Sequence, residues 1–325
     1  MRKILVTGGL GYVGSVLVDN LIKENYQVNV IDLGIYGNNL KNNNNLKVFI
    51  GDIRNKELFY QSVVGCDTVI HLACISNDPS FDLNPNLGKS INLDAFRPMV
   101  EISKNNGVER FIYASSSSVY GIKEQNNVDE TFSLEPLTDY SIYKAECEKI
   151  LLEFQSSNFT TTILRPATVC GYSPRQRFDL VVNILTNLAF NKNIITVFGG
   201  NQLRPNIHIN DMVNAYMQII EMPIEKIAGE IFNVGFQNMS VLEIANLVKN
   251  SINKNVEVKI ESTDDNRSYH ISSNKIINNL NFKTNYTVEN AIKDLIDCFN
   301  KKIFINSLNN ENYFNIKKMN SINLK

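Results

Sequence analysis

The chain has 325 residues, 43% of them hydrophobic and 20% charged, which is enough for one or two globular domains with a sizeable core. Its 32 basic and 33 acidic residues leave a formal net charge of -1, which excludes a general electrostatic attraction to nucleic acid or anionic membranes. Five cysteines without a close pair favour a reducing compartment, and no membrane-length apolar run or signal-peptide pattern is present, so we expect a cytoplasmic protein.

Short runs of β-branched residues alternate with longer amphipathic stretches in the first half of the chain. Because alternating strands and helices build a parallel sheet with helices on both faces, this pattern predicts an α/β fold of the doubly wound Rossmann type. The strands are expected at residues 3–7, 28–33, 47–50, 68–73, 110–114 and 161–165.

The pattern becomes less regular after Pro166, where short mixed elements carry several polar segments. We therefore expect a Rossmann domain over residues 1–166 and a smaller C-terminal substrate-binding lobe over most of 167–300. Residues 301–325 are an Asn/Lys-rich tail, expected to form a surface helix with a loosely ordered end.

A glycine-rich turn follows the first predicted strand directly and leads into a helix-forming run. Glycines in this context are typical of a dinucleotide-binding turn, because bare backbone lets a pyrophosphate reach the amide groups at the helix N-terminus. The residues expected to contact the dinucleotide here are Gly8, Gly11, Tyr12, Val13 and Gly14.

Acidic residues close the next two strands. Asp32 ends the second strand, where a carboxylate accepts hydrogen bonds from the adenosine ribose hydroxyls and repels a 2′-phosphate, so NAD is favoured over NADP. Asp52 and Ile53 follow the third strand, at the edge expected for the adenine, although Asp52 taken alone is more often a turn residue.

Tyr140 and Lys144 lie four residues apart in a predicted helix, so both project from one helix face. A tyrosine with its ordinary pKa of about 10 is a poor base near neutrality, unless nearby cations such as Lys144 and a nicotinamide stabilise its phenolate. The serines at 115–118 follow the fifth strand at the ligand-binding edge of the sheet, where one of them can hold a reacting alcohol.

Together these motifs resemble the extended short-chain dehydrogenase/reductase family, in particular its NAD-dependent nucleotide-sugar epimerases, dehydratases and 4-oxidoreductases. The resemblance extends to about residue 300 and implies that Tyr140 is the general base, that Lys144 binds the nicotinamide ribose and lowers the tyrosine pKa, and that Ser116 holds the substrate oxygen. It rests on the glycine turn and on Gly51-Asp-Ile-Arg54, His71-Leu72-Ala73, Asn92, Ser115-Ser-Ser-Ser-Val-Tyr-Gly121, Tyr140-x-x-x-Lys144, Leu164-Arg-Pro166 and Arg204-Pro-x-x-His-x-x-Asp211. The remaining cofactor contacts expected from these motifs are Leu72, Ala73, Ser115 and Pro166.

The residues after Ser116 bear on the reaction. Related dehydratases carry an acidic pair there, decarboxylases a Glu, and fucose-synthase-like enzymes a Cys two residues on, whereas this chain has Ser117 and Ser118. By elimination the chemistry is limited to hydride transfer at C4. We expect a nucleotide-sugar 4-epimerase, with a 4-dehydrogenase or 4-ketoreductase in polysaccharide sugar biosynthesis as the alternative. A non-catalytic NAD-binding sensor is disfavoured because Tyr140 and Lys144 are both present.

The expected substrate is a nucleotide-diphosphate sugar. Guanidinium groups bind diphosphate oxygens in pairs, so Arg204 and Arg267, in the polar loops of the second lobe, are the first candidates to bind the diphosphate, with Arg175 and Arg177 weaker ones. Thr168 stands near the position where many 4-epimerases carry an Asn that contacts the nucleotide phosphate. The remaining predicted substrate contacts are Ser76, Asn77, Ser116 and Ser117.

Three histidines, His71, His208 and His270, are scattered without matching carboxylates, which predicts no metal site. His71 lies in an apolar strand and is expected to be structural or adjacent to the cofactor. The family also implies a homodimer, and nothing in the sequence predicts a nucleic-acid or membrane partner.

Overall fold

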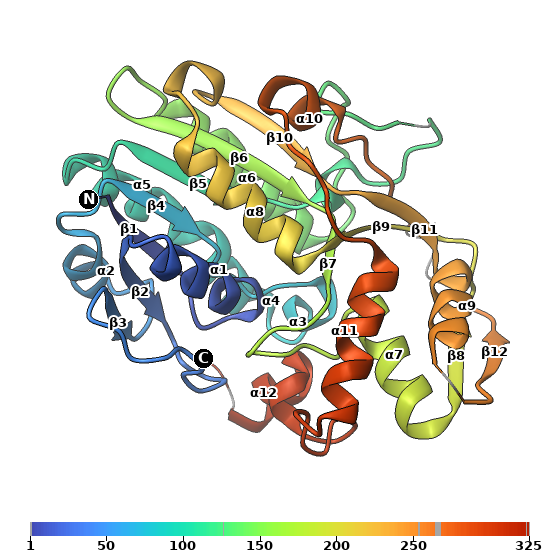
Figure 1. Ribbon diagram of the computed structural model, residues 1–325. Helices are drawn as coiled ribbons and strands as arrows, with labels where there is room; N and C mark the ends of the chain where they lie inside the picture. Colours follow the sequence, from blue (N-terminus) through green and yellow to red (C-terminus); the bar gives the residue numbers. More distant parts are fainter. Residues whose placement is uncertain (1, 126, 253, 264–267, 323, 325) are drawn as a thin grey trace.

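The computed structural model describes residues 2–125, 127–252, 254–263, 268–322 and 324 (Figure 1). Among them, seven strands form one parallel sheet in the order β10-β6-β5-β4-β1-β2-β3, which confirms the α/β prediction. The strands are β1 (Lys3–Thr7), β2 (Gln27–Asp32), β3 (Leu46–Ile50), β4 (Thr68–His71), β5 (Arg110–Ala114), β6 (Thr160–Pro166) and β10 (Glu230–Val234).

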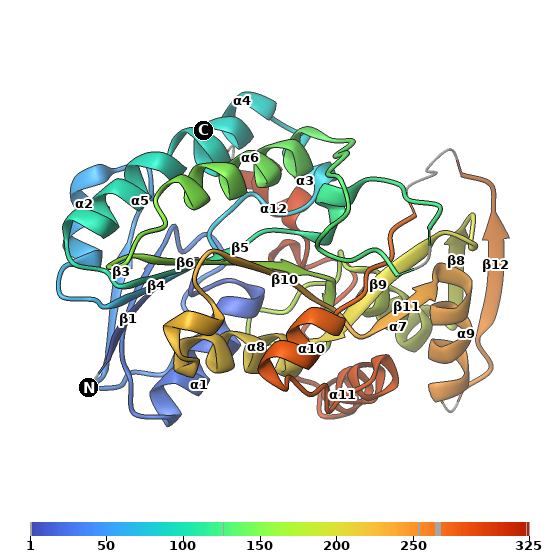
Figure 2. The same cartoon turned by 90° about the horizontal axis from the view of Figure 1, so that it is seen from above.

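Helices cover both faces of this sheet, as Figure 2 shows. Each face has its own buried apolar cluster, which is why the central strands are almost continuously apolar rather than alternating. One face carries α2 (Lys56–Val63), α5 (Phe96–Asn105) and α6 (Asp139–Glu153). The other carries α1 (Tyr12–Lys23), α8 (Ile209–Glu221) and α10 (Asn274–Leu280), while α11 (Val288–Asn300) lies on the same side but packs on the smaller lobe.

The six strands predicted from the first half of the chain are all present, with ends that differ by at most two residues. The seventh, β10, comes from beyond Pro166 and pairs with β6 at the edge of the sheet. Helix α8, also from the later part of the chain, packs against α1. The domain boundary at residue 166 stays a prediction, and the sheet itself draws on chain from both sides of it.

The smaller lobe has an apolar cluster of its own beneath two small sheets. One sheet joins β7 (Thr168–Cys170), β9 (Leu203–His208) and β11 (Gln237–Ser240); the other joins β8 (Ile194–Phe198) and β12 (Glu257–Glu261). Helices α7 (Val181–Lys192), α9 (Val241–Ser251) and α11 pack together over this cluster.

Short helices complete the chain. Between β4 and α5 lie α3 (Asp78–Phe81), α4 (Pro85–Lys89) and the π-helix η1 (Ser90–Asp94); the 3-10 helices are η2 (Ser117–Tyr120), η3 (Ile224–Lys226) and η4 (Glu311–Tyr313). None of the helices in the described part of the chain is both long and apolar enough to cross a membrane.

Part of the C-terminal tail packs against the body of the protein. It forms helix α12 (Asn315–Ile322), which contacts α3, and its Asn315 and Met319 are buried. Met319 joins the apolar cluster on the α5 and α6 face of the main sheet, and Leu324 packs against that cluster. These apolar contacts and the hydrogen bonds of Asn315 hold the segment in place, and the composition of the segment does not indicate them.

Candidate active site

A pocket of about 540 Å³ lies at the carboxyl ends of the main strands, between the sheet and the smaller lobe. Strand order reverses between β1 and β4, and ligands of open α/β sheets bind at this position. Its volume is in the range of small-molecule and cofactor sites. Elements from both lobes and from the C-terminal segment contribute to its wall.

The glycine turn after β1 forms one end of this pocket. Gly8 has a φ of +72°, and a Cβ on it would lie 2.7 Å from the Ala73 backbone nitrogen. A Cβ on Gly14 would lie 2.2 Å from the Gly8 carbonyl oxygen. Since side chains fit at neither position, the turn brings bare backbone to the N-terminus of α1, as a pyrophosphate site requires.

Gly11, Tyr12 and Val13 also line the pocket. The Tyr12 side chain is largely used elsewhere, because its hydroxyl donates a hydrogen bond of 2.7 Å to the Gly171 carbonyl and so links α1 to the second lobe. Burial raises the pKa of this phenol far above its ordinary value, although a hydrogen bond from Asn183 opposes the effect.

Asp32 reaches the pocket from the end of β2. Its carboxylate accepts hydrogen bonds from the backbone nitrogens of Leu10 at 3.0 Å and Gly34 at 2.9 Å. Burial raises the pKa of Asp32, while these two hydrogen bonds hold it down. The carboxylate is thereby fixed beside the glycine turn.

Asp52 lines the pocket but is tied to its neighbour Arg54, whose Nη2 donates to it at 2.6 Å. Burial alone would raise the pKa of Asp52, but the hydrogen bonds and charge of Arg54 lower it overall. This pairing fits the turn interpretation of Asp52. The other predicted cofactor contacts also line the pocket: Ile53, Leu72, Ala73, Ser115 and Pro166.

The structure brings Ser116, Tyr140 and Lys144 together. Thr138 and Ser141 form a capping box that starts α6 and holds Tyr140 in its first turn. The Ser116 and Tyr140 side chains line the same pocket, and Ser116 acts to lower the pKa of the Tyr140 phenol. The Lys144 Nζ donates to the Ala114 carbonyl oxygen at 2.6 Å and lies 5.8 Å from the centroid of the Tyr140 ring.

The environment of Tyr140 keeps its phenol protonated at neutral pH. Burial raises its pKa well above the ordinary value, and Cys74 and Asp78 add to this effect, while Arg177 and Ser116 oppose it. A base at this position therefore needs further positive charge nearby. The oxidised nicotinamide is a group of that kind.

A buried ion pair behind this cluster was not predicted. Arg165, at the end of β6, donates from Nη2 to Glu148 of α6 at 2.6 Å, and both side chains are 3% exposed. Glu148 also accepts a hydrogen bond from the Ser115 hydroxyl. Because Ser115 follows Ala114, whose carbonyl holds Lys144, the pair fixes the strand end that positions the lysine.

Most of the predicted substrate contacts line the same pocket: Ser76, Asn77, Ser116, Ser117, Thr168, Arg177 and Arg204. The Asn77 side chain also accepts a hydrogen bond from the Ser80 backbone nitrogen at 3.0 Å, which caps α3. Arg177 is nearly buried and donates to Asp179 at 2.8 Å and to Ser76 at 3.1 Å. Arg267 lies outside the described residues.

The histidines have structural partners. His71 is buried, and its Nδ1 forms a 2.7 Å hydrogen bond with the Thr7 hydroxyl; burial lowers its pKa to about 3. His208 contacts Asp294 at 3.2 Å, and His270 bonds to the Gln125 carbonyl. Among the described residues, no group of three or more His, Cys, Asp or Glu side chains could hold a metal ion.

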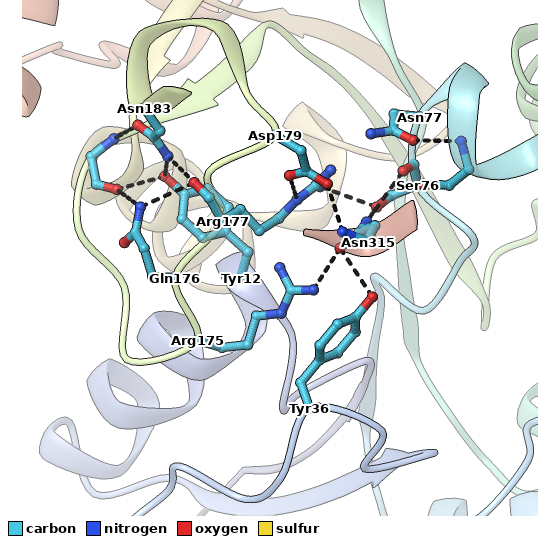
Figure 3. Close-up of polar contacts among 12 residues, drawn as sticks. Tyr12, Tyr36, Ser76, Asn77, Arg175, Gln176, Arg177, Asp179, Asn183 and Asn315 are labelled. Carbon is cyan, nitrogen blue, oxygen red and sulfur yellow. Dashed lines mark hydrogen bonds and ion pairs between the residues drawn. The ribbon is translucent and has the colours of Figure 1, made fainter. Parts of the chain in front are cut away.

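Sequence reasoning missed a second set of residues in the pocket, Tyr36, Asp179 and Asn315, and ranked Arg175 low. They form one polar network with Arg177 and Ser76 (Figure 3). No sequence signal could have joined them, because Tyr36 and Asn315 lie 279 positions apart.

The NAD dependent epimerase/dehydratase family matches residues 4–235. The chain belongs to this family. NAD is accordingly its cofactor, as expected from Asp32, and the glycine turn and fixed Asp32 carboxylate fit that group.

Individual relatives agree with this assignment. An uncharacterized UDP-glucose epimerase of Bacillus subtilis is 32% identical over 262 residues, covering 76% of this chain and 81% of the relative. A putative UDP-glucose 4-epimerase of Methanocaldococcus jannaschii is 29% identical over 303 residues, covering 90% of this chain and 97% of the relative.

Solved structures are similar over almost the whole chain. UDP-glucose 4-epimerase from Thermotoga maritima with UDP-glucose aligns with a TM-score of 0.81 at 27% identity, covering 93% of this chain and 100% of that one. UDP-glucuronic acid 4-epimerase from Bacillus cereus, in complex with UDP-glucuronic acid and NAD, aligns with a TM-score of 0.82 at 26% identity, covering 93% and 100%.

Proposed function

We propose that this chain is an NAD-dependent nucleotide-sugar 4-epimerase that removes and returns a hydride at C4 of the sugar. The observation that carries the proposal is the meeting of Ser116, Tyr140 and Lys144 in the pocket that also holds the glycine turn and Asp32. This arrangement places a candidate base, a cation and a dinucleotide site around one space.

Each catalytic side chain has a role that follows from its contacts. Tyr140 is the general base for the C4 hydroxyl proton, and Ser116, which lines the pocket with it, holds the same substrate oxygen. Lys144, fixed by the Ala114 carbonyl, stabilises the phenolate and binds the nicotinamide ribose. When bound, NAD supplies the hydride acceptor and, once reduced, the donor that returns the hydride.

A nucleotide sugar as substrate is supported by the compared structures, which are named for UDP-glucose and UDP-glucuronic acid. In this chain, Arg177 and Arg204 line the pocket and provide guanidinium groups for a diphosphate. We propose Ser76, Asn77, Ser117 and Thr168 as further substrate contacts.

Dehydratases are also among the relatives, for example a dTDP-D-glucose 4,6-dehydratase of Mus musculus that is 28% identical over 324 residues. The hydroxyls of Ser117 and Ser118 stand where related dehydratases carry an acidic pair, which favours epimerisation. The pocket wall also contains the carboxylate of Asp78. Its Oδ1 accepts a hydrogen bond of 2.6 Å from the hydroxyl of Thr138, the residue that caps the start of α6, so this carboxylate already has a structural role.

Isotope labelling tests this proposal. UDP-glucose, UDP-glucuronic acid and dTDP-glucose, each carrying deuterium at C4, are incubated with the NAD-loaded protein, and products are identified by NMR. A 4-epimerase yields the C4 epimer with its deuterium retained and requires no added oxidant. Tyr140→Phe serves as the inactive control.

Other products would replace the proposal. Deuterium that accumulates on the nicotinamide, with turnover that requires an acceptor, would indicate a 4-dehydrogenase or 4-ketoreductase. Loss of the C6 hydroxyl would indicate a dehydratase. NAD binding without turnover of any member of the panel would favour the non-catalytic sensor.

We further propose that the protein is a homodimer in the cytoplasm that supplies sugars for polysaccharide biosynthesis. The family resemblance supports the homodimer and the sugar pathway, and the five cysteines without a close pair support the cytoplasm. Light scattering of the NAD-loaded protein tests the oligomeric state, since a monomer at micromolar concentration would contradict it.

A further inference from the structure

Arg175 is a buried cation that its protein neighbours satisfy only in part. It is 4% exposed, and its Cζ lies 3.6 Å from the centroid of the Tyr36 ring. Its Nη2 donates to the Asn315 Oδ1 at 2.6 Å, but Nε and Nη1 have no hydrogen-bond partner among the described residues. A buried charge with unused donors is costly unless an anion or other acceptor meets it.

Nearby carboxylates are already engaged. Asp179 accepts from the Arg177 Nε at 2.8 Å and from the Asn315 backbone nitrogen at 2.9 Å. Asp32 accepts hydrogen bonds from two backbone amides, that of Leu10 in the glycine turn and that of Gly34 in its own loop. Burial lowers the pKa of Arg175 to about 10, so the group stays charged at neutral pH, and Arg175 is one of the residues that line the pocket.

Arg175 and Arg177 face different parts of this pocket. Arg175 stacks on Tyr36, four residues after Asp32 in the loop that follows β2, at the end of the pocket formed by the glycine turn. Arg177 instead donates to Ser76 and acts electrostatically on Tyr140. Arg175 thus lies against the loop after β2 and opposes the rise that burial causes in the pKa of Asp32, whereas Arg177 is hydrogen-bonded to the loop after β4.

The C-terminal helix holds Arg175 in this position. Asn315 Oδ1 accepts from the Tyr36 hydroxyl at 3.0 Å as well as from Arg175, and its Nδ2 donates to the Ser76 Oγ at 3.1 Å (Figure 3). Met319 and Leu324 of the same segment line the pocket. One short segment thus ties the loops after β2 and β4 to the second lobe.

We propose that Arg175 binds the pyrophosphate of bound NAD, and that the C-terminal segment, through Asn315, acts as a latch that retains the dinucleotide. The shared ligand chemistry is a diphosphate, and the geometry assigns Arg175 to the dinucleotide rather than to the nucleotide sugar. This inference rests on NAD as the cofactor and stands whether or not the reaction is a 4-epimerisation.

Binding measurements on Arg175→Met test the first part. NAD-free protein is titrated by calorimetry with NAD, with ADP and with UDP, and Arg97→Met, at a partly exposed arginine of α5, is the matched control. Loss of a charge-assisted contact should lower the affinities for NAD and ADP by about 10- to 100-fold. The affinity for UDP, and all three affinities of Arg97→Met, should stay within about twofold of the wild-type values. Unchanged NAD affinity, or weakened UDP binding with unchanged ADP binding, would overturn the assignment.

Asn315 variants test the latch. NAD release from loaded protein is followed after dilution into an NAD trap, with Asn320→Ala as the control because Asn320 is exposed on the same helix. Asn315→Ala should release NAD about tenfold faster, as expected for the loss of one or two hydrogen bonds that hold the segment.

A second variant covers the case in which Asn315→Ala fails to fold. Asn315→Asp keeps acceptors for Tyr36 and Arg175 but places a carboxylate against the guanidinium, which competes with the pyrophosphate. It should lower NAD affinity by about tenfold, as expected for one charge-assisted contact, at unchanged melting temperature. Wild-type NAD affinity and release in Asn315→Asp would rule out the latch.

Discussion

Replacing Lys144 by Met removes a buried cation whose Nζ lies 5.8 Å from the centroid of the Tyr140 ring. Two unit charges at that separation interact by about 3 kcal/mol at an effective dielectric constant of about 20. This corresponds to about 2 pH units, and we expect about 1 to 2 because the phenolate charge lies largely on the oxygen rather than at the ring centroid. Because the cation stabilises the phenolate, its loss raises the pKa of Tyr140. The limb on which activity rises with pH should therefore move up by about 1 to 2 pH units.

The assay is the pH profile of kcat and kcat/KM at saturating NAD, since Lys144 also contacts the cofactor in the proposed role. Lys149→Met is the matched control, because Lys149 is exposed on the same helix and its loss should leave the profile in place. If Lys144→Met lowers activity by one factor at every pH, the lysine acts by positioning alone and the electrostatic reasoning is wrong.

Four further changes have defined outcomes. Tyr140→Phe should reduce turnover by about 10²- to 10⁴-fold while calorimetry still detects NAD binding; near wild-type turnover would require another base. Asp32→Ala should narrow the preference for NAD over NADP in the same titration, and an unchanged ratio would contradict the ribose contact. Glu148→Gln leaves the Arg165 guanidinium uncompensated and should lower the free energy of unfolding in urea by about 3–5 kcal/mol, whereas a change below about 0.5 kcal/mol would refute the pairing. His71 is neutral in the fold, with its pKa lowered from 6.5 to about 3, so stability should fall as pH drops through that window. In urea unfolding, His71→Gln should remove the part of the pH dependence of stability that lies between pH 6.5 and 3.

The main sheet could be predicted largely from sequence because both of its faces are buried. All four residues of strand β4 are buried and the first three, Thr68, Val69 and Ile70, are β-branched; such runs stand out in a single sequence. Strand β10 reads Glu-Ile-Phe-Asn-Val and carries no such signal. Its place in the sheet depends on pairing with β6, which is a tertiary contact that local patterns do not encode.

The same distinction applies to the site. The glycine turn and the four-residue spacing of Tyr140 and Lys144 are local, so their geometry follows from strand, turn and helix alone. The pair between Glu148 and Arg165 joins two elements 17 residues apart, and each partner taken singly resembles an ordinary surface charge. Only the fold shows that both are buried and that their charges meet.

Composition is least informative for the C-terminal segment. An Asn- and Lys-rich stretch cannot in general bury enough apolar surface to offset the entropy of ordering it, which is why a loose tail is the natural expectation. Here Met319 supplies apolar burial and Asn315 forms hydrogen bonds with four other residues, so a few side chains decide the outcome. If Arg175 also binds the pyrophosphate, docking of the segment and binding of NAD share a residue. By thermodynamic linkage, each of the two equilibria then favours the other by the same factor. A docked segment slows NAD release, and bound NAD keeps the segment docked.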